Sequence, residues 1–503
     1  MTLNRPIASK LNVTRRKPGE RHNKAGFTLA DLARNCLLIL GLMMLNRLGS
    51  AGTIVFLVVL MIWMSKGPLA VLQVLSIFFL AMIANKAFVP NNSVLTQGRF
   101  LLLVVAIWQV FVAMQNRGYA MFTRKHVVAL VWFCLACAVL TTISRYYVVI
   151  SLLKIISFLL FTTVLLILAD ILKNRKGEVT LWFFSIIATS VFLGIVSMGT
   201  GVSMNMDRLA KTKSAESFFN GPFDHSQTLG TTAALMIVYL LGLTLFTRHA
   251  IRWLSIPLIL VLGYFMYLAT SRTSLLALGI GILVMLLMVM RYRPSGGIKL
   301  KLNFSKSQII TTSVVICCLV FVMDFTSGGG VSATAMEFLV KYDPNVSGKH
   351  DTITKELFKS REGQIEMMML NIRKQPIVGL GFGTSTSEEF ISEATLLSAP
   401  TEKGFLFLAI VEETGIIGTI FFAVFLISIV RFYHARKNLI ALGMFATFLG
   451  VNMGEMLFFS FGGQGGFLWV FIVGSILMGK ECTFLRRASE KPNVRRSKTL
   501  VRV

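Results

Sequence analysis

The sequence predicts an all-α membrane protein, a polytopic bundle of about 12–14 transmembrane helices with one large loop on the outer side. Hydrophobic residues make up 55% of the 503 residues and charged residues only 15%, whereas soluble domains carry roughly 25% charged residues. Many apolar runs approach the roughly 20 residues that cross a bilayer. These runs are continuous and do not alternate with polar residues, which predicts helices and excludes a β-barrel.

Apolar length and flanking charge place about fourteen spans along the chain. They cover residues 29–46, 51–64, 67–85, 100–115, 126–142, 147–171, 178–197, 227–246, 253–269, 274–290, 307–324, 414–431, 438–459 and 466–479. If the N-terminus is cytoplasmic, alternation of these spans puts the basic short loops inside, as the positive-inside rule expects. The connection 291–306, for example, carries five Lys and Arg residues and no acid.

The spans divide the chain into five parts. These are a basic cytoplasmic arm (1–28), transmembrane helices (29–324) with an outer loop at 198–226, a large outer loop (325–404), C-terminal transmembrane helices (405–479) and a basic cytoplasmic tail (480–503). The large loop holds ten of the 23 acidic residues. Its piece 352–372 has apolar residues at helical spacing, and Pro376 and several glycines then end the helix.

The formal net charge of +27 raises the alternative of a nucleic-acid partner. The basic residues, however, gather in short loops and at both ends of the chain. Topology explains this distribution, and binding to anionic lipid headgroups is the second explanation. The sequence therefore predicts a lipid bilayer as partner and no nucleic acid.

Arginines at the outer boundary are candidate anion-binding residues. Arg272 lies in the short turn 270–274 between two apolar runs. Its guanidinium could bind a phosphate through two hydrogen bonds, although a side chain that snorkels at a helix end is the simpler alternative. Arg361 and Arg373 lie in the large outer loop, and each could also be an ordinary solvated charge.

Ionisable groups near the outer boundary complete the candidate set, namely Lys403, Glu413, Asp224 and His225. Asp224 and His225 end the loop 198–226, and His225 is either a base or part of a helix-capping turn. Glu413 lies inside a long apolar stretch, and ionisable groups at such depth are functional candidates. We expect a short interfacial helix over 404–413 before a span that begins at Thr414. The six histidines are scattered without metal-ligand spacing, so we expect neither a metal nor a cofactor.

Several motifs occur in an order that resembles the O-antigen ligase / polysaccharide polymerase family of bacterial inner-membrane proteins. They are the Ser-Arg-Thr-Ser turn that opens the Leu-rich run Ser271–Met290, an Arg near the start of a loop helix (Arg361), the Pro-x-x-Gly-x-Gly turn Pro376–Gly381, and the Glu-Thr-Gly-x-x-Gly stretch Glu413–Gly418. The segment 217–227 also resembles the family's earlier outer loop. The resemblance covers residues 215–430 best.

The resemblance implies a metal-independent C-type glycosyltransferase of the inner membrane, with both termini cytoplasmic and the outer loops in the periplasm. It implies transfer of a glycan from undecaprenyl-diphosphate-linked oligosaccharide to a glycan or lipid acceptor, with other polysaccharide export proteins as further partners. Arg272 and Arg361 would hold the lipid diphosphate, and Arg373 is a third candidate. Many relatives carry a His-Asn pair where this chain has Glu402 and Lys403, so Glu402 is the first choice for the base and His225 the second.

Polymerisation of exopolysaccharide or O-antigen repeat units is the leading expectation for function. Ligation of finished glycan to lipid A core or to protein uses the same donor chemistry and is the alternative. A flippase for lipid-linked oligosaccharide belongs to another class, and it should show two similar halves and broken helices. The sequence indicates neither feature clearly. A scaffold within a polysaccharide assembly complex is the third class.

Overall fold

The computed structural model describes residues 28–90, 93–118, 124–144, 148–200, 219–246, 251–269, 271–291, 362–383, 403–436 and 438–476. Within these ranges the regular structure is helical, and β-type pairing is limited to an isolated bridge between Ala84 and Phe223. The all-α prediction is therefore confirmed for this part of the chain. The predicted arm 1–28, the tail 480–503 and most of the loops 198–226 and 325–404 lie outside the described residues.

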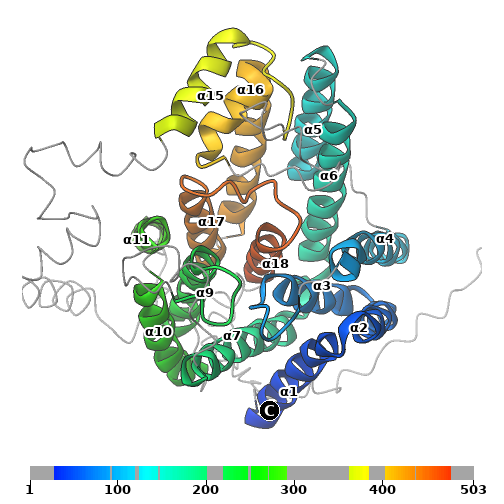
Figure 1. The fold of residues 1–503 in the computed structure, drawn as a ribbon, viewed down its shortest axis with the longest axis vertical. Helices are drawn as coiled ribbons and strands as arrows, with labels where there is room; N and C mark the ends of the chain where they lie inside the picture. The colour runs from blue at the N-terminus through cyan, green and yellow to red at the C-terminus, as the bar shows by residue number, and fades with distance from the viewer. Residues whose placement is uncertain are drawn as a thin grey trace, which may run out of the picture.

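The helices form one bundle in which α17 and α18 lie in the middle, with α15 and α16 at the upper end in Figure 1. In chain order they are α1 (Leu29–Leu45), α2 (Gly49–Met64), α3 (Pro68–Ile83), α4 (Ser93–Gln115), α5 (Lys125–Ser144), α6 (Val148–Ile171), α7 (Lys176–Gly199), α9 (Ser226–Phe246), α10 (Ile251–Leu268), α11 (Arg272–Arg291), α15 (Glu362–Lys374), α16 (Leu406–Ala435), α17 (Leu439–Val451) and α18 (Gln464–Ile476). Short 3-10 turns, η1 (Asn46–Leu48) and η3 (Leu172–Asn174), follow α1 and α6.

Each predicted span within the described residues is occupied by a helix, and the span 307–324 lies outside them. Seven helical runs are long and apolar enough to cross a membrane. The first, Leu29–Met64, is a single run of 36 residues that contains α1, η1 and α2 and bends at Gly49, whose φ is 76°. Five further apolar helices have 10–17 residues. The chain is therefore a helical membrane protein.

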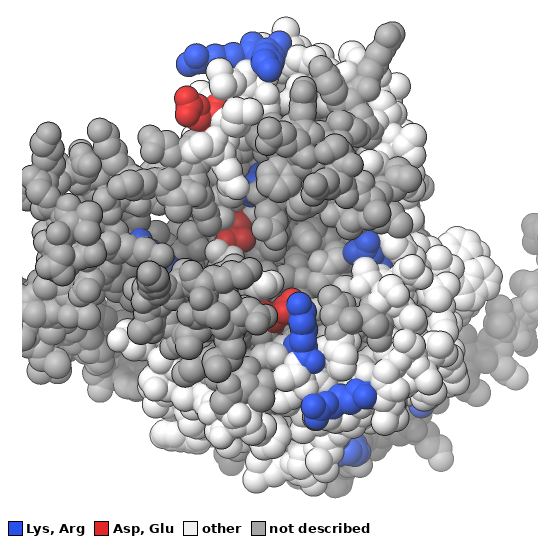
Figure 2. All heavy atoms as spheres, in the orientation of Figure 1, with Lys and Arg blue, Asp and Glu red and all other residues white. Residues whose placement is uncertain are grey.

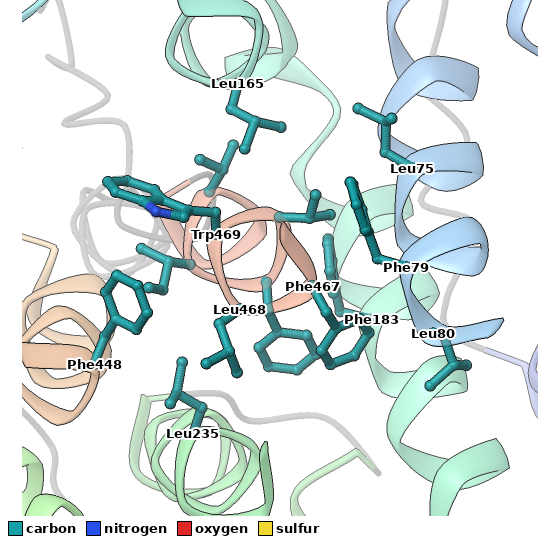
Figure 3. Close-up of a cluster of buried hydrophobic side chains, with 14 of the residues drawn as sticks. Leu75, Phe79, Leu80, Leu165, Phe183, Leu235, Phe448, Phe467, Leu468 and Trp469 are labelled. Atoms are coloured by element: carbon teal, nitrogen blue, oxygen red, sulfur yellow. The ribbon is translucent and has the colours of Figure 1, made fainter. Parts of the chain in front are cut away.

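Helix α18 forms the centre of the bundle. Its side chains are buried along its whole length, from Gly465 to Ile476. Figure 3 shows residues of α3, α6, α7, α9 and α17 around it, namely Leu75, Phe79, Leu80, Leu165, Phe183, Leu235 and Phe448. The indole Nε1 of Trp469 donates a hydrogen bond of 2.9 Å to the Phe458 carbonyl, which satisfies the polar atom of this large ring.

The predicted span 438–459 is wrong in its second part, because α17 ends at Val451. Asn452 explains where the helix stops. Its side-chain Nδ2 donates to the Phe448 carbonyl at 2.7 Å, and its Oδ1 accepts the amide hydrogens of Leu457 and Phe458 at 2.8 and 2.7 Å. Apolar surroundings require every backbone polar group to find a partner. One asparagine supplies these partners and allows the chain to turn toward α18.

One end of the bundle is held by an ion-pair cluster around Asp170 in α6. Arg436, which follows α16, pairs with Asp170 and lies over the ring of Phe432 at 4.0 Å. Arg124, which precedes α5, lies 3.6 Å from the same carboxylate through its Nε. Only 5% of the Asp170 side chain is exposed. The cluster ties α5, α6 and α16 together, and we call this the Asp170 end.

Candidate functional site

The predicted residues Arg272 and His225 lie at the same end of two neighbouring helices. Arg272 is the first residue of α11, and His225 immediately precedes α9. The side chains of Ser271 and Ser274 share a hydrogen bond of 2.6 Å. Both serines pack against Gly230 in α9. An added Cβ at Gly230 would lie 2.4 Å from the Ser271 Cβ. We call this part of the bundle the Arg272 end.

Contacts through α17 connect the Arg272 end with the beginning of α16. An added Cβ at Gly450, near the end of α17, would lie 2.9 Å from the Cα of Ala277 in α11. Two residues later, the Asn452 carbonyl accepts a 2.9 Å hydrogen bond from the amide of Leu406, the first residue of α16. The starts of α9, α11 and α16 therefore lie at one end of the bundle. The Asp170 end, where α16 terminates, is the opposite end.

Helix α16 is broken at Gly415, where φ is 59° and ψ is −169°. In an uninterrupted helix the carbonyls of residues 412 and 413 accept from the amides four residues later. Here the segment 376–383, which follows α15 and which we call the inserted loop, takes over these hydrogen bonds. The replacement bonds run from Leu380 N to Glu412 O, from Gly381 N to Glu413 O and from Ile416 N to Pro376 O, each at 2.9 Å.

The break partly matches the sequence prediction of an interfacial helix over 404–413 followed by a span from Thr414. It also shows a broken helix, a feature that the sequence does not indicate clearly. The break was not evident from hydropathy because the run stays apolar on both sides of the two glutamates. Backbone that leaves a helix at membrane depth must be satisfied by neighbouring protein. The inserted loop does this for α16.

Two glycines allow the inserted loop and α16 to pass each other at backbone distance. Gly379 has a φ of +77°, and an added Cβ there would lie 2.5 Å from the Glu413 carbonyl carbon. Gly415 has a φ of +59°, and its added Cβ would lie 2.1 Å from the Ile377 carbonyl oxygen. Both positions need a conformation that L-residues disfavour, and both lack space for a side chain. One glycine from each sequence motif, Pro376–Gly381 and Glu413–Gly418, is thus required by the same close approach of the inserted loop to α16.

A buried charged cluster joins the inserted loop to α16. The ammonium of Lys403 lies 2.8 Å from Glu412 Oε2 and 3.0 Å from Glu413 Oε1. The other carboxylate oxygens accept from Asn371 Nδ2 and from the Gly383 amide, both at 2.7 Å. The glutamate side chains are 0% exposed and the lysine 2%. We call Lys403, Glu412 and Glu413 with these two donors the clasp.

Electrostatics keep Lys403 charged inside the clasp. Burial by itself lowers the pKa of its ammonium, but Glu413 and Glu412 outweigh burial, so the pKa of Lys403 is raised above its ordinary value. Each carboxylate oxygen of the clasp already has a partner. Lys403 and Glu413, which the sequence predicts as outer-face candidates, are therefore buried partners of one another.

Residues of α5 and α6 hold the other side of the inserted loop. Lys154 in α6 donates from Nζ to the Gly383 carbonyl. Thr141 in α5 accepts the amide hydrogen of Phe382 at 3.1 Å through its hydroxyl oxygen. Gly383 is thus held at its carbonyl by Lys154 and at its amide by Glu413.

The remaining predicted site residues have different surroundings. His225 is exposed, and its Nε2 lies 3.8 Å from Asp224 Oδ2. Arg272 is partly exposed. Arg373 is exposed on α15, two residues after the buried Asn371, and residues two apart on a helix face different directions. Arg361 and Glu402 lie outside the described residues.

Sequence reasoning missed Lys154 and Asn371. Lys154 had a usable signal, because a single lysine inside the apolar run 147–171 is costly and therefore a functional candidate. Asn371 had none, since a polar residue in a loop helix is ordinary. No three His, Cys, Asp or Glu side chains of the described part come together as metal ligands.

Charged groups are sparse on the face of the bundle drawn in Figure 2. Among the residues placed there, the blue Lys and Arg side chains stand apart on a largely neutral surface. The clasp differs from the Asp170 cluster in burial, since all three of its ionisable side chains are buried and the arginines around Asp170 are partly exposed.

A scan against protein-family models finds no match to this chain. A search of curated proteins also finds none. The family assignment therefore remains a resemblance carried by the sequence motifs.

Proposed function

We propose that this protein transfers a glycan from an undecaprenyl-diphosphate-linked oligosaccharide to an acceptor at the periplasmic face of the bacterial inner membrane. Polymerisation of exopolysaccharide or O-antigen repeat units is the favoured reaction. The observation that carries the proposal is the interlocking of the two motifs, Pro376–Gly381 and Glu413–Gly418, at the bundle end that also carries Arg272. Motifs recognised separately by resemblance thus belong to one structural unit.

The proposed chemistry needs little beyond charge stabilisation and one proton acceptor. The bond between the anomeric carbon and the phosphate oxygen of the donor breaks, and a new bond forms from that carbon to an acceptor hydroxyl oxygen. The diphosphate leaves with the bonding electrons, and a guanidinium such as that of Arg272 stabilises the developing charge. The hydroxyl proton passes to a base, for which Glu402 is our first choice and His225 our second.

The described contacts divide the candidates between two kinds of role. Glu413 and Lys403 are buried with each other, so a direct contact of either with a sugar hydroxyl is disfavoured. Asp224 and His225 are accessible beside the start of α9. Asp224 and His225 are therefore better suited to contact the substrate. Lys403 and Glu413 are better suited to position the backbone of the site.

A transporter of lipid-linked oligosaccharide is the second candidate, because transporters also contain broken helices. Secondary transporters commonly bind substrates and ions at broken helices, where backbone groups are left for the ligand. In α16 the carbonyls of Glu412 and Glu413 are instead bonded by the inserted loop. The break is filled by the chain itself, which favours the enzyme.

Purified protein in lipid nanodiscs tests the proposal. It receives undecaprenyl-diphosphate oligosaccharide without nucleotide sugar and with EDTA. Longer lipid-linked chains are expected for a polymerase, whereas glycan on lipid A core or protein would indicate a ligase. If no acceptor becomes glycosylated, and proteoliposomes instead move the lipid-linked donor between leaflets, the enzyme proposal is wrong and the transporter stands.

A further inference from the structure

The clasp joins Gly383 and Lys403, two points of the backbone that lie far apart in the sequence. Both bind the same side chain, since the Gly383 amide donates to Glu413 Oε2 at 2.7 Å and Lys403 Nζ lies 3.0 Å from Glu413 Oε1. One carboxylate thus fixes the distance between these two points of the backbone.

Charge balance extends this arrangement to α6. Glu412 and Glu413 bring two carboxyl groups together, and Lys403 places its ammonium between them. Lys154 places a second ammonium nearby, because its Nζ donates to the carbonyl of Gly383, the residue whose amide donates to Glu413. Two acids and two bases therefore meet across α6, the inserted loop and α16. Buried charges persist where they are paired and hydrogen-bonded in this way.

Such a cluster is a costly way to gain stability. The desolvation of buried ion pairs often cancels their attraction, and apolar side chains of similar size can serve equally well. Charged pairs do, however, fix geometry, because their hydrogen bonds are directional and removal of one partner is unfavourable. This favours a role in holding a particular arrangement over a role in stability alone.

We propose that Lys403, Glu412, Glu413 and Lys154 are positioning residues for the transfer reaction. They hold the inserted loop against α16 and fix Gly383 and Lys403 relative to each other. This inference rests on the proposed function. It assigns the glutamate of the Glu-Thr-Gly motif to alignment of the site and not to contact with the substrate.

Neutral variants separate positioning from stability. K403M leaves two buried carboxylates without their shared cation, and we expect its melting temperature in detergent to fall. The triple variant K403M/E412Q/E413Q carries no charge in the clasp, and we expect it to recover most of the melting temperature. Its kcat should stay about 10–100-fold below wild type while the KM for the lipid-linked donor changes less than about twofold, because misorientation slows the chemical step.

A conservative variant and a surface control complete the comparison of kcat values. The conservative K403R should retain more kcat than K403M, since it keeps the cation. R175M/E178Q neutralises an exposed pair separated by 3.8 Å and should leave kcat unchanged. If the triple variant recovers both melting temperature and kcat, the clasp is only structural and the inference is wrong.

Hydrogen–deuterium exchange tests the same inference without activity. Amides of residues 376–383 should exchange slowly in the wild type and at least about tenfold faster in the triple variant, because opening of the loop exposes their hydrogen bonds. Unchanged exchange would overturn the positioning role. If exchange rises but the wild type transfers no glycan, the proposed function fails while the anchoring of the loop by the clasp stands.

Discussion

Gly379 lies so close to Glu413 that an added Cβ would be 2.5 Å from the carbonyl carbon of the glutamate. The two residues belong to segments that the sequence shows only as separate motifs, a glycine turn and an acidic helix start. Their contact makes the break in α16 and the inserted loop a single feature.

Alanine at either crossing glycine should destabilise the protein strongly. Gly379→Ala and Gly415→Ala each place a side chain at positive φ, which costs on the order of 1–3 kcal/mol, and each adds an overlap with backbone that cannot move aside easily. We expect a clear loss of melting temperature in detergent. Gly279→Ala in α11 is the matched control, because nothing lies within 4 Å of its added Cβ. Equal melting temperatures for all three variants would contradict the crossing.

Trp469→Ala should be among the most damaging core substitutions. The ring is fully buried between Phe448 and Phe458, and large-to-small changes at such sites cost about 3–5 kcal/mol. Trp132→Ala is the control, since Trp132 is 56% exposed and its loss opens no cavity. Thermal unfolding followed by tryptophan-independent light scattering compares the two. A Trp132 variant as unstable as the Trp469 variant would place the centre of the bundle elsewhere.

Asp170→Asn should loosen the end of the bundle opposite the clasp. The substitution removes the charge that Arg124 and Arg436 share, and a lost charged hydrogen bond costs about 1.5–3 kcal/mol. We expect a lower melting temperature and intact transfer chemistry in the folded fraction. Glu178→Gln, in an exposed pair with Arg175, should change stability by less than about 1 kcal/mol. A larger effect of Glu178→Gln would show that the cluster has no special role.

Arg272→Ala should abolish most of the transfer by the folded protein. Removal of one preorganised donor to a developing charge typically lowers kcat by about 10²–10³-fold. Arg272→Lys should recover only part of the rate, because an ammonium lacks the bidentate geometry of a guanidinium. Arg47→Ala, at an exposed arginine between α1 and α2, is the control. Wild-type turnover by the Arg272→Ala variant would remove Arg272 from the site.

The helical fold was predictable because composition and continuous apolar length leave few other solutions in a bilayer. The early end of α17 was not, since residues 453–463 are largely apolar or small and give no boundary signal. Only the folded chain reveals that Asn452 satisfies the backbone of this turn. Hydropathy therefore places the helices along the chain but does not show where a single polar side chain ends one.

The candidate site was predictable residue by residue but not as an arrangement. Glu413 and Lys403 were singled out for their position near the boundary, yet their mutual contact depends on folding across the break at Gly415. The partner Asn371 comes from α15, and Lys154 from a distant helix. Long-range pairing of this kind leaves no local pattern in one sequence.

The release of free undecaprenyl diphosphate measures the central claim most directly. Purified wild-type protein in nanodiscs, given the lipid-linked oligosaccharide and EDTA, should release one lipid diphosphate for each new glycosidic bond, and the Arg272→Ala variant should release little. Mass spectrometry of the lipid and glycan products gives both quantities. Glycan elongation without lipid diphosphate release, or no release under any acceptor condition, would contradict the account.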